Sequence, residues 1–244
     1  MPEPALDTEK LTRIRKVIAT RMRDSLAGSA QLTSVVEVDM SNIMHIRQAY
    51  GATFRETHGV SLSQLSIIAR GVCQLLHEHR MLNAQIDLEQ GTATYFSAVN
   101  LGIAVDSDKG LMVPNLKGAE RLSVASLASG IKDLAERSRS SRLRPEDLEG
   151  GTFTITNTGS RGSLLDTPIL NTPEVGILAI GAVTRRPAVI NDGQSERIEA
   201  RDLAYLCLTY DHSLVDGADA SRFLTQLKSW LETTDLQSEV ETPV

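Results

Sequence analysis

The chain has 244 residues, of which 41% are hydrophobic, 23% charged and only 4% aromatic. These proportions are typical of one large globular domain with an aliphatic core. The 25 basic and 31 acidic residues give a formal net charge of −6, which argues against a broad basic surface for nucleic acid.

The cysteines and the apolar runs argue against disulfide-rich, zinc-binding and membrane proteins. Cys73 and Cys207 are too few and too scattered for a disulfide framework or a zinc site, and both fall in apolar segments. We expect them to be buried free thiols in a reducing compartment. No apolar run approaches the roughly 18 residues that a membrane span needs, and residues 1–9 lack a signal pattern. The prediction is a cytoplasmic protein that does not enter a membrane.

Three segments divide the chain. Residues 1–9 are polar and carry two prolines, as expected of a linker remnant or an N-terminal arm. Residues 10–232 hold the periodic apolar patterns and form the predicted domain. Residues 233–244 are a mostly polar, acidic tail.

The domain is predicted to begin with a helix. From Ile14 to Gly28, apolar residues recur at three- and four-residue spacing, and the opposite face is basic and includes Arg15 and Arg21. Taken alone, such a basic face indicates contact with solvent.

A strand and two helices are predicted next. Residues 31–40 have the β-branched content of a strand, and Ser41 is the expected cap of a helix that extends to about residue 57. A second helix is expected from about residue 62 to residue 79. Its end carries His77 and His79, which are two residues apart and therefore point to different sides, so they are not a predicted metal pair.

After residue 82, the spacing of apolar residues changes from the helical period to a period of two. Residues 83–116 are expected to form antiparallel strands with tight turns at residues 89–91 and 108–110.

A further amphipathic helix, capped by Ser123, is predicted over residues 123–140. It leads into a run of four arginines: Arg137, Arg139, Arg142 and Arg144. Cations at the C-terminal end of a helix are favoured by its dipole, which is one interpretation of this run. The other is a contact with phosphate, because guanidinium groups match phosphate geometry.

Residues 150–159 predict another strand that runs into a turn. Phe153 and Ile155 alternate with Thr154 and Thr156, which indicates a half-buried strand, and Thr156 taken alone is an ordinary β-branched strand residue. Further strands are expected at residues 175–182 and 186–190, with a hairpin turn at residues 191–193. The chain then returns through residues 196–210.

The last predicted strand and helix enclose a candidate base. His212 follows the apolar run 203–208 and precedes a helical pattern, and neutral imidazole accepts a proton near pH 7. A loop histidine with a local hydrogen bond would fit the same position. Asp216, followed by Gly217, lies four residues after His212, where its carboxylate can neutralise an arginine or orient the loop.

This stretch resembles a known signature. The pattern Tyr-Asp-His-x-x-x-Asp-Gly, followed at residues 223–224 by Phe-Leu, is similar to that of the chloramphenicol acetyltransferase-like acyltransferases. More narrowly, it resembles the catalytic domain of the dihydrolipoamide acyltransferases of 2-oxo acid dehydrogenase complexes. Ser213 departs from the arginine that is usual there. Residues 15–22 and 153–159 are similar to two further motifs of that family, in the expected order.

The resemblance implies a fold and partners. The expected fold is α/β, a two-layer sandwich with a mixed β-sheet, assembled as a homotrimer with a reaction channel at each subunit interface. Coenzyme A and the lipoyl arm of a lipoyl domain would enter that channel from opposite sides. Partner proteins would be the 2-oxo acid dehydrogenase and dihydrolipoamide dehydrogenase components.

The resemblance also implies roles for individual residues. His212 would remove the proton of the attacking thiol, and Thr156, followed by Asn157, would donate a hydrogen bond to the oxyanion from an adjacent subunit. Arg15, or alternatively Arg21, would pair with Asp216. The arginine run would contact the phosphates of coenzyme A. No metal is implied, and acetyl is the expected acyl group, with succinyl and branched-chain acyl groups as alternatives.

The sequence lacks the signatures of several other enzyme classes. The chain contains no Gly-x-Ser-x-Gly for a serine hydrolase and no Gly-x-x-x-x-Gly-Lys-Ser/Thr for a nucleotide-binding loop. A metal enzyme that uses Asp211, His212 and Asp216 would need a second histidine nearby. The remaining alternative is a trimeric scaffold that binds partner dehydrogenases without catalysis.

Overall fold

The structure is a computed structural model that describes residues 7–107, 110–191, 193 and 195–237. Most of the predicted N-terminal arm and about half of the predicted tail lie outside the described residues. The same holds for parts of the predicted turns at 108–110 and 191–193. No helix in the described part of the chain is both long enough and apolar enough to cross a membrane.

The described chain contains both helices and strands. The α-helices are α1 (Arg13–Gly28), α2 (Ser41–His58), α3 (Gln64–Glu78), α4 (Val124–Arg139) and α5 (Gly217–Thr233). The strands are β1 (Gln31–Asp39), β2 (Ala84–Asp87), β3 (Thr92–Tyr95), β4 (Leu101–Ile103), β5 (Val105–Ser107), β6 (Gly110–Met112), β7 (Asn115–Leu116), β8 (Phe153–Asn157), β9 (Gly176–Ile180), β10 (Thr184–Asn191) and β11 (Glu196–Asp211). Short 3₁₀ turns are η1 (Ala119–Arg121), η2 (Pro145–Asp147) and η3 (Gly159–Arg161).

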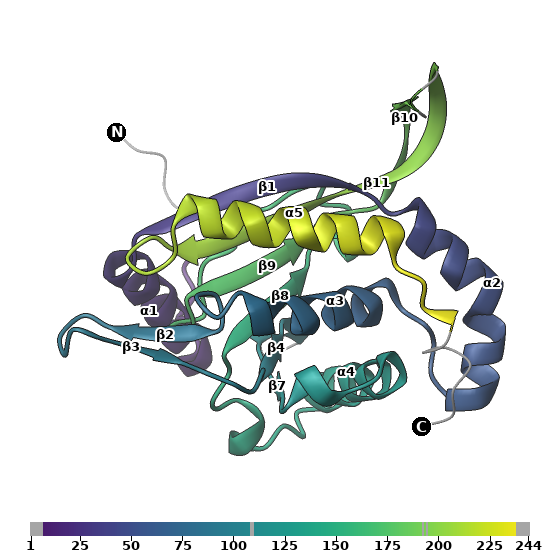
Figure 1. The fold of residues 1–244 in the computed structure, drawn as a ribbon. Coiled ribbons are helices and arrows are strands. Elements are labelled where there is room, and N and C mark those ends of the chain that lie inside the picture. Colours follow the sequence, from purple (N-terminus) through teal and green to yellow (C-terminus); the bar gives the residue numbers. More distant parts are fainter. Residues whose placement is uncertain (1–6, 108–109, 192, 194, 238–244) are drawn as a thin grey trace.

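A mixed sheet forms the centre of the molecule (Figure 1). Its strands follow the order β1, β11, β9, β8, β4 and β7, and β10 extends from β11 as a hairpin. β8 is parallel to β4 and β9, whereas β11 is antiparallel to β1, β9 and β10. The predicted α/β fold with a mixed sheet is therefore confirmed.

The region 83–116 differs in part from its prediction. β2 and β3 form the expected antiparallel hairpin, and so do β5 and β6. β4, however, enters the main sheet in parallel beside β8. Leu101 and Ile103 are buried, as are their partners Phe153 and Ile155, so β4 is a central strand instead of a hairpin arm.

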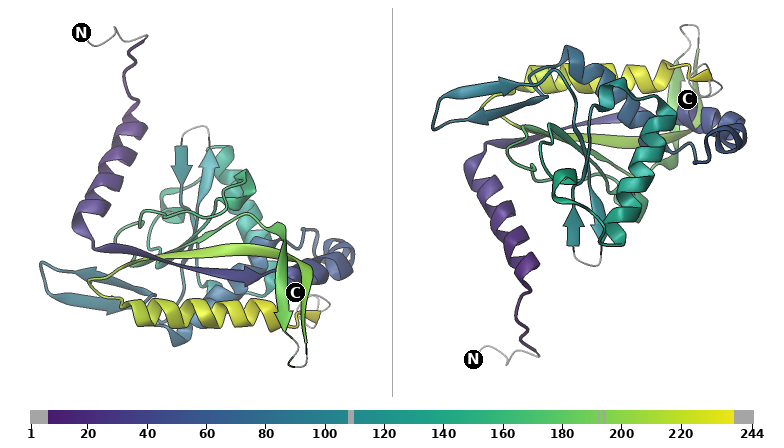
Figure 2. Two further views of the ribbon diagram at one scale, coloured as in Figure 1. Left: turned by 90° about the horizontal axis from the view of Figure 1, so that it is seen from above. Right: turned by 90° about the horizontal axis from the view of Figure 1, so that it is seen from below.

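One face of the sheet packs against α3, α4 and α5 (Figures 1 and 2). Alternate residues of each strand point to this face, and the helices present their apolar stripes to it. The core includes Ile67, Val72, Leu76, Leu127, Phe153, Ile155, Leu206, Leu208, Phe223 and Leu227. Full burial of each such side chain stabilises the fold by about 1.5–3 kcal/mol.

The opposite face of the sheet carries smaller and more polar residues. On this face lie Thr154, Ala179, Cys207 and Thr209, all of them buried. The segment 158–174 is tied to α1 and β1 on this side, because Ser25 Oγ donates to the Leu170 carbonyl at 2.7 Å and the Leu170 N–H donates to Gln31 Oε1 at 3.0 Å.

Helix α1 projects away from the body of the molecule (Figure 2). Ser25 is its one buried residue, whereas Ile14, Val17 and Leu26 are 43%, 52% and 53% exposed. The predicted helix is present, but its apolar stripe is not covered by the described part of the chain. Exposed apolar stripes of this kind are a feature of surfaces that contact another chain.

Two local predictions are wrong. Met40, not Ser41, is the N-cap of α2, and Ser41 Oγ instead accepts a hydrogen bond from the Asp202 N–H at 3.0 Å. The polar side of β8 is also not open to solvent, because Thr154 is completely buried and donates to Glu174 Oε2 at 2.5 Å. Both differences depend on residues distant in sequence.

Candidate active site

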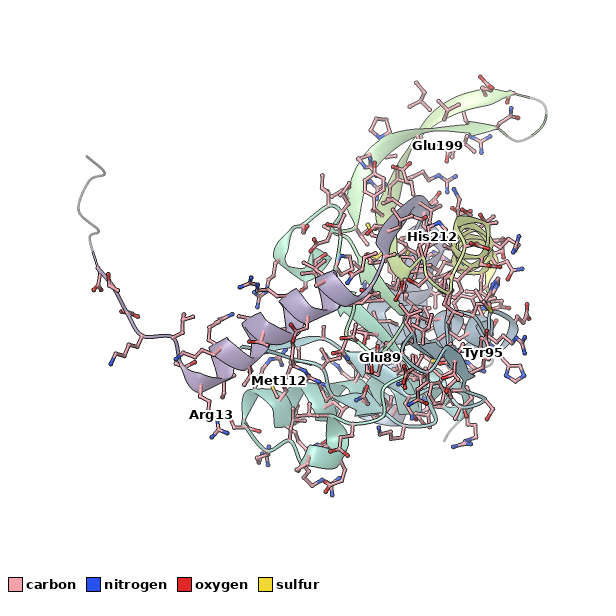
Figure 3. The ribbon with its side chains drawn as sticks, turned by 90° about the vertical axis from the view of Figure 1, so that its left-hand side faces the viewer. Arg13, Glu89, Tyr95, Met112, Glu199 and His212 are labelled. Atoms are coloured by element: carbon pink, nitrogen blue, oxygen red, sulfur yellow. The ribbon has the colours of Figure 1, made fainter. Side chains whose placement is uncertain are left out.

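His212 lies at the junction between β11 and α5, as predicted. Its side chain is 41% exposed, and its backbone N–H donates to the Ala30 carbonyl at 2.8 Å. The main chain at His212 is therefore held where α1 passes into β1 (Figure 3). The imidazole stays accessible from outside the chain, as a general base requires.

The turn that carries His212 is fixed by Asp211. The Asp211 side chain is buried, and Oδ1 accepts hydrogen bonds from the Ala30 N–H at 3.1 Å and the Ser213 N–H at 2.9 Å. The Asp211 N–H donates to the Val175 carbonyl at 3.0 Å. Sequence reasoning considered Asp211 only as a metal ligand and missed this function. The signal for it was an aspartate two residues before a serine at a strand end, which is the pattern of an Asx turn.

Asp216 is the N-cap residue of α5, but its side chain makes no capping hydrogen bond. It is 79% exposed, and Oδ1 lies 3.9 Å from Nδ1 of His212. The structure thus brings Asp216 and His212 together, at a distance that orients the imidazole only weakly. Gly217, the first residue of α5, is next to them in the chain, and a Cβ there would lie 3.4 Å from the Tyr210 hydroxyl, an ordinary contact.

The predicted pair between Arg15 and Asp216 does not form within the described chain, and neither does the alternative with Arg21. His212 is the ion-pair partner of Asp216 among the described residues. The physical reason is the direction of α1, since its C-terminal end is close to His212 and Arg15 lies 13 residues before Gly28. At 1.5 Å per residue, that distance along the helix is about 20 Å. Figure 3 likewise shows Arg13, at the start of α1, far from His212.

Thr156 and Asn157 form the end of β8. Asn157 Oδ1 accepts a hydrogen bond from the Ser160 N–H at 3.2 Å and holds the turn that follows. Thr156 is partly buried, and its hydroxyl has no hydrogen-bond partner among the described residues. It is thus a free donor at the end of a rigid central strand.

Thr156 and His212 are far apart within one chain. Thr156 pairs with Ala179, which pairs with Cys207, so His212 lies five residues further along the direction of β11. Two strand spacings also separate β8 from β11. With about 3.4 Å per residue and about 4.8 Å per strand, the separation is on the order of 20 Å. A site that uses both side chains therefore needs two copies of the chain.

The four arginines after α4 differ in their surroundings. Arg137 binds Asp133 at 2.7 Å and also Asp147, and this pairing holds the pKa of Asp147 below its ordinary value and raises the pKa of Arg137. Arg144 Nη2 lies 3.7 Å from Asp147 Oδ1. Asp147 belongs to η2, so its contact with Arg137 joins α4 to η2. Arg137 lies in the last turn of α4, as the interpretation of a helix end expects, whereas Arg144 lies beyond α4 as the N-cap of η2.

Arg139 and Arg142 are exposed. Arg142 Nε donates to Ser140 Oγ at 2.8 Å, and neither guanidinium forms an ion pair within the described residues. They remain the two members of the run that are available to a phosphate.

A cleft of about 360 Å³ lies elsewhere, between the β10–β11 hairpin and the C-terminal part of α5. Its lining includes the basic residues Arg201 and Lys228 and the acidic residues Asp39 and Glu232. It contains neither His212 nor Thr156. In the described part of the chain, no group of three or more His, Cys, Asp or Glu side chains is arranged to hold a metal ion.

The sequence matches the family model of the 2-oxoacid dehydrogenases acyltransferase (catalytic domain) over residues 3–237. The chain belongs to this family. The resemblance inferred from the signature around His212 is therefore confirmed.

Curated relatives carry two different acyltransferase names. The chain is 45% identical over 234 residues to the dihydrolipoyllysine-residue acetyltransferase component of the pyruvate dehydrogenase complex of Corynebacterium glutamicum, covering 96% of this chain and 35% of that protein. It is 43% identical over 224 residues to the succinyltransferase component of the 2-oxoglutarate dehydrogenase complex of Bartonella vinsonii, covering 91% and 53%. The chain thus spans only part of the length of these relatives.

Solved structures agree with the family fold. The dihydrolipoamide acetyltransferase of Azotobacter vinelandii superposes with a TM-score of 0.89 at 29% identity, covering 98% of this chain and 95% of that one. Its study concerns the catalytic roles of a serine, a histidine and an asparagine four residues after the histidine. Chloramphenicol acetyltransferase, at 13% identity and a TM-score of 0.54 over 91% of this chain and 96% of that one, shares the fold.

Proposed function

We propose that this chain transfers an acyl group, most readily acetyl, between a dihydrolipoyl arm and coenzyme A. The observation that carries the proposal is the placement of His212, half exposed on a main-chain-anchored turn with Asp216 four residues on. The studied histidine and asparagine of the A. vinelandii enzyme have the same spacing. The higher identity to an acetyltransferase supports the choice of acetyl.

The reaction begins with proton removal. His212 accepts the proton of the attacking thiol, because the thiolate is the nucleophile. The thiolate then forms a carbon–sulfur bond to the carbonyl carbon of the acyl thioester, and the electron pair of the carbonyl moves to oxygen.

Thr156 of a neighbouring subunit donates a hydrogen bond to this oxyanion. A donor of this kind supplies about 3 kcal/mol of transition-state stabilisation. Collapse of the tetrahedral intermediate breaks the bond to the other sulfur, which recovers the proton from His212. Each step is carried by a side chain, so the proposal includes no metal.

The proposed assembly is a homotrimer. The separation of Thr156 and His212 supports a second copy at each site, and the exposed stripe of α1 is available to contact that copy. Three copies are what the family resemblance implies. Because relatives are named as components of dehydrogenase complexes, we propose the 2-oxo acid dehydrogenase and dihydrolipoamide dehydrogenase components and a lipoyl domain as partners. The free thiols of Cys73 and Cys207 are buried and agree with a cytoplasmic location.

Coenzyme A would be held in part through its phosphates. Arg139 and Arg142 are the preferred contacts, since Arg137 and Arg144 already bind Asp147. The lipoyl arm and coenzyme A act as carriers that are brought to the site.

The test is acyl transfer from acetyl-, succinyl- and isobutyryl-coenzyme A to free dihydrolipoamide, followed by release of the coenzyme A thiol. Preferential turnover of acetyl-coenzyme A is the expected result. Preference for succinyl-coenzyme A would assign the chain to the second group of relatives, which are nearly as similar. A folded trimer that uses none of the donors would contradict catalysis and leave a scaffold for partner enzymes.

A further inference from the structure

A buried polar cluster lies inside the sheet, apart from the side chains that the reaction uses. At its centre is Glu174, which is 3% exposed. Glu174 Oε2 accepts a hydrogen bond from Thr154 Oγ1 at 2.5 Å, and Oε1 accepts one from Asn171 Nδ2 at 2.8 Å. The cluster therefore joins β8 to the turn that precedes β9.

The carboxyl of Glu174 is buried without an ion pair. No Lys, Arg or His forms a salt bridge with it among the described residues, and Lys117 acts on it only through its charge at longer range. Burial raises the pKa of Glu174 to about 7, against the opposing effect of the hydrogen bonds from Thr154 and Asn171. Burying an acid in this way costs free energy, which makes a purely space-filling function a poor explanation.

The surroundings are adapted to the carboxyl group. A Cβ at Gly151 would collide with Glu174 Oε1 and with Asn115 Oδ1, so both oxygens face the same glycine. Asn115 Oδ1 is a buried acceptor without a partner among the described residues. A protonated Glu174 supplies a donor close to this acceptor. The absence of a side chain at Gly151 thus leaves room for the cluster.

The cluster lies between the two parts of the chain that the proposed reaction uses. Thr154 and Thr156 are two residues apart on β8 and so point to the same face of the sheet. Val175, next to Glu174, accepts the backbone hydrogen bond of Asp211, the residue before His212. Because Glu174 accepts the hydrogen bond of Thr154, a shift of its carboxyl group would act directly on β8, the strand that carries Thr156.

We propose that Glu174 is a positioning residue, which fixes β8 through Thr154 so that the Thr156 hydroxyl meets the oxyanion. The inference rests on the proposed function. Glu174 does not touch the substrate, and its effect is exerted through Thr156. Misplacement of a reacting group by about 1 Å can lower turnover about 100-fold, so a hydrogen bond two residues away is sufficient.

The first test compares E174A with E174Q in the trimer. E174A removes both acceptors and should lower kcat about 10- to 100-fold, with the KM for acyl-coenzyme A changed less than about 3-fold. E174Q keeps an acceptor and supplies a donor, so it should recover kcat to within about 5-fold of wild type. Equal kcat for E174A and wild type would overturn the inference.

The matched control is S66A. Ser66 is completely buried, and its hydroxyl donates to the Ser63 carbonyl at 2.8 Å at the start of α3. The variant loses a buried hydrogen bond that has no connection with β8, so its kcat should stay at the wild-type value. A loss of kcat in S66A equal to that in E174A would overturn the inference, because any buried defect would then have the same effect.

The second test is a double-mutant cycle with T156V. If Glu174 acts through Thr156, the kcat penalty of E174A should be at least about 3-fold smaller in the T156V background than in wild type. If the fold-reductions of kcat in E174A and T156V multiply fully in the double variant, the inference is overturned.

Hydrogen exchange separates this inference from the proposed function. E174A should exchange the amides of β8 at least about 10-fold faster than wild type, with α5 unchanged. Unchanged exchange in β8 would overturn the inference whatever the activity. A wild-type protein without transfer activity, but with this exchange result, would contradict the proposed function and leave the link between Glu174 and β8 in place.

Discussion

At the scale of single residues, His212 is placed by backbone bonds and by a neighbouring aspartate. Asp211 closes the turn with two hydrogen bonds to N–H groups, while the imidazole itself is left exposed. Removal of the imidazole therefore deletes the proposed base without disturbing the contacts that shape the turn.

The first prediction concerns this base. H212A should abolish acyl transfer, because it removes the imidazole that is the proposed general base, and should leave the trimer and its unfolding temperature unchanged. Turnover and sedimentation measured on the same preparation provide the check. Turnover near the wild-type rate would remove His212 from the mechanism.

The second prediction concerns the oxyanion donor. T156V keeps the β-branched shape and removes the hydroxyl, so turnover should fall about 100-fold. T156S retains the donor and is the matched control, with turnover expected within a few-fold of wild type. If T156V and T156S have the same rate, Thr156 is an ordinary strand residue.

At the scale of elements, β8 combines the proposed oxyanion donor at its end with a buried polar residue in its middle. Thr154 is as fully buried as Phe153, although the alternating sequence predicts one apolar and one polar face. The exception arises because Glu174, twenty residues later, supplies a partner for the hydroxyl. Thr154 is completely buried on this central strand, so its hydroxyl needs such a partner.

The third prediction follows from the raised pKa of Glu174. Between pH 4.5, the ordinary pKa of a glutamate, and about pH 7, the folded chain keeps a proton on Glu174 that the unfolded chain has lost. Its contribution to stability is complete below pH 4.5 and is lost as the pH rises through about 7. Relative to E174Q, the free energy of unfolding of wild type should fall by about 2 to 3 kcal/mol between pH 5 and pH 8.

Urea unfolding of both proteins at one fixed protein concentration measures this difference. The Gln side chain does not titrate, so the subtraction removes the effects of all other ionisable groups. A difference between wild type and E174Q that is constant with pH would show that Glu174 is ionised throughout.

Local patterns explain which elements the sequence could predict. Helical spacing and Ser123 predicted α4, and Ser123 Oγ indeed accepts the Ser126 N–H. The apolar run before His212 likewise predicted the end of β11. Pairings between distant segments were not predictable in this way. The parallel pairing of β4 with β8 joins residues about fifty positions apart, and no periodicity in either segment encodes it.

The same limit applies to the candidate site. The spacing of His212 and Asp216 is local, and the structure brings them together. A partner for Asp216 on α1 depends on where that helix points, which its sequence does not specify. The apolar stripe of α1 could be read from the sequence, whereas its exposure could not.

At the scale of the whole molecule, the two halves of the site lie on opposite parts of one chain. Each subunit would offer its base to one neighbour and its donor to the other, which is the geometry of a head-to-tail ring. In the proposed mechanism, the oligomer is needed for the reaction as well as for covering α1.

The fourth prediction tests this division. H212A and T156V, each nearly inactive alone, should recover activity when unfolded together in equal amounts and refolded. Random assembly gives an intact base facing an intact donor at about a quarter of the interfaces, so about a quarter of wild-type activity is expected. The two variants refolded separately and then mixed are the control. No recovery after joint refolding would show that each site is built from a single chain.

The separation of base and donor also has a meaning for biosynthesis. In a single folded chain, the proposed base His212 and the proposed donor Thr156 are separated by a distance on the order of 20 Å. If the proposed site is shared between copies, acyl-transfer activity appears only on assembly, so it should rise more steeply than linearly with the concentration of finished chains.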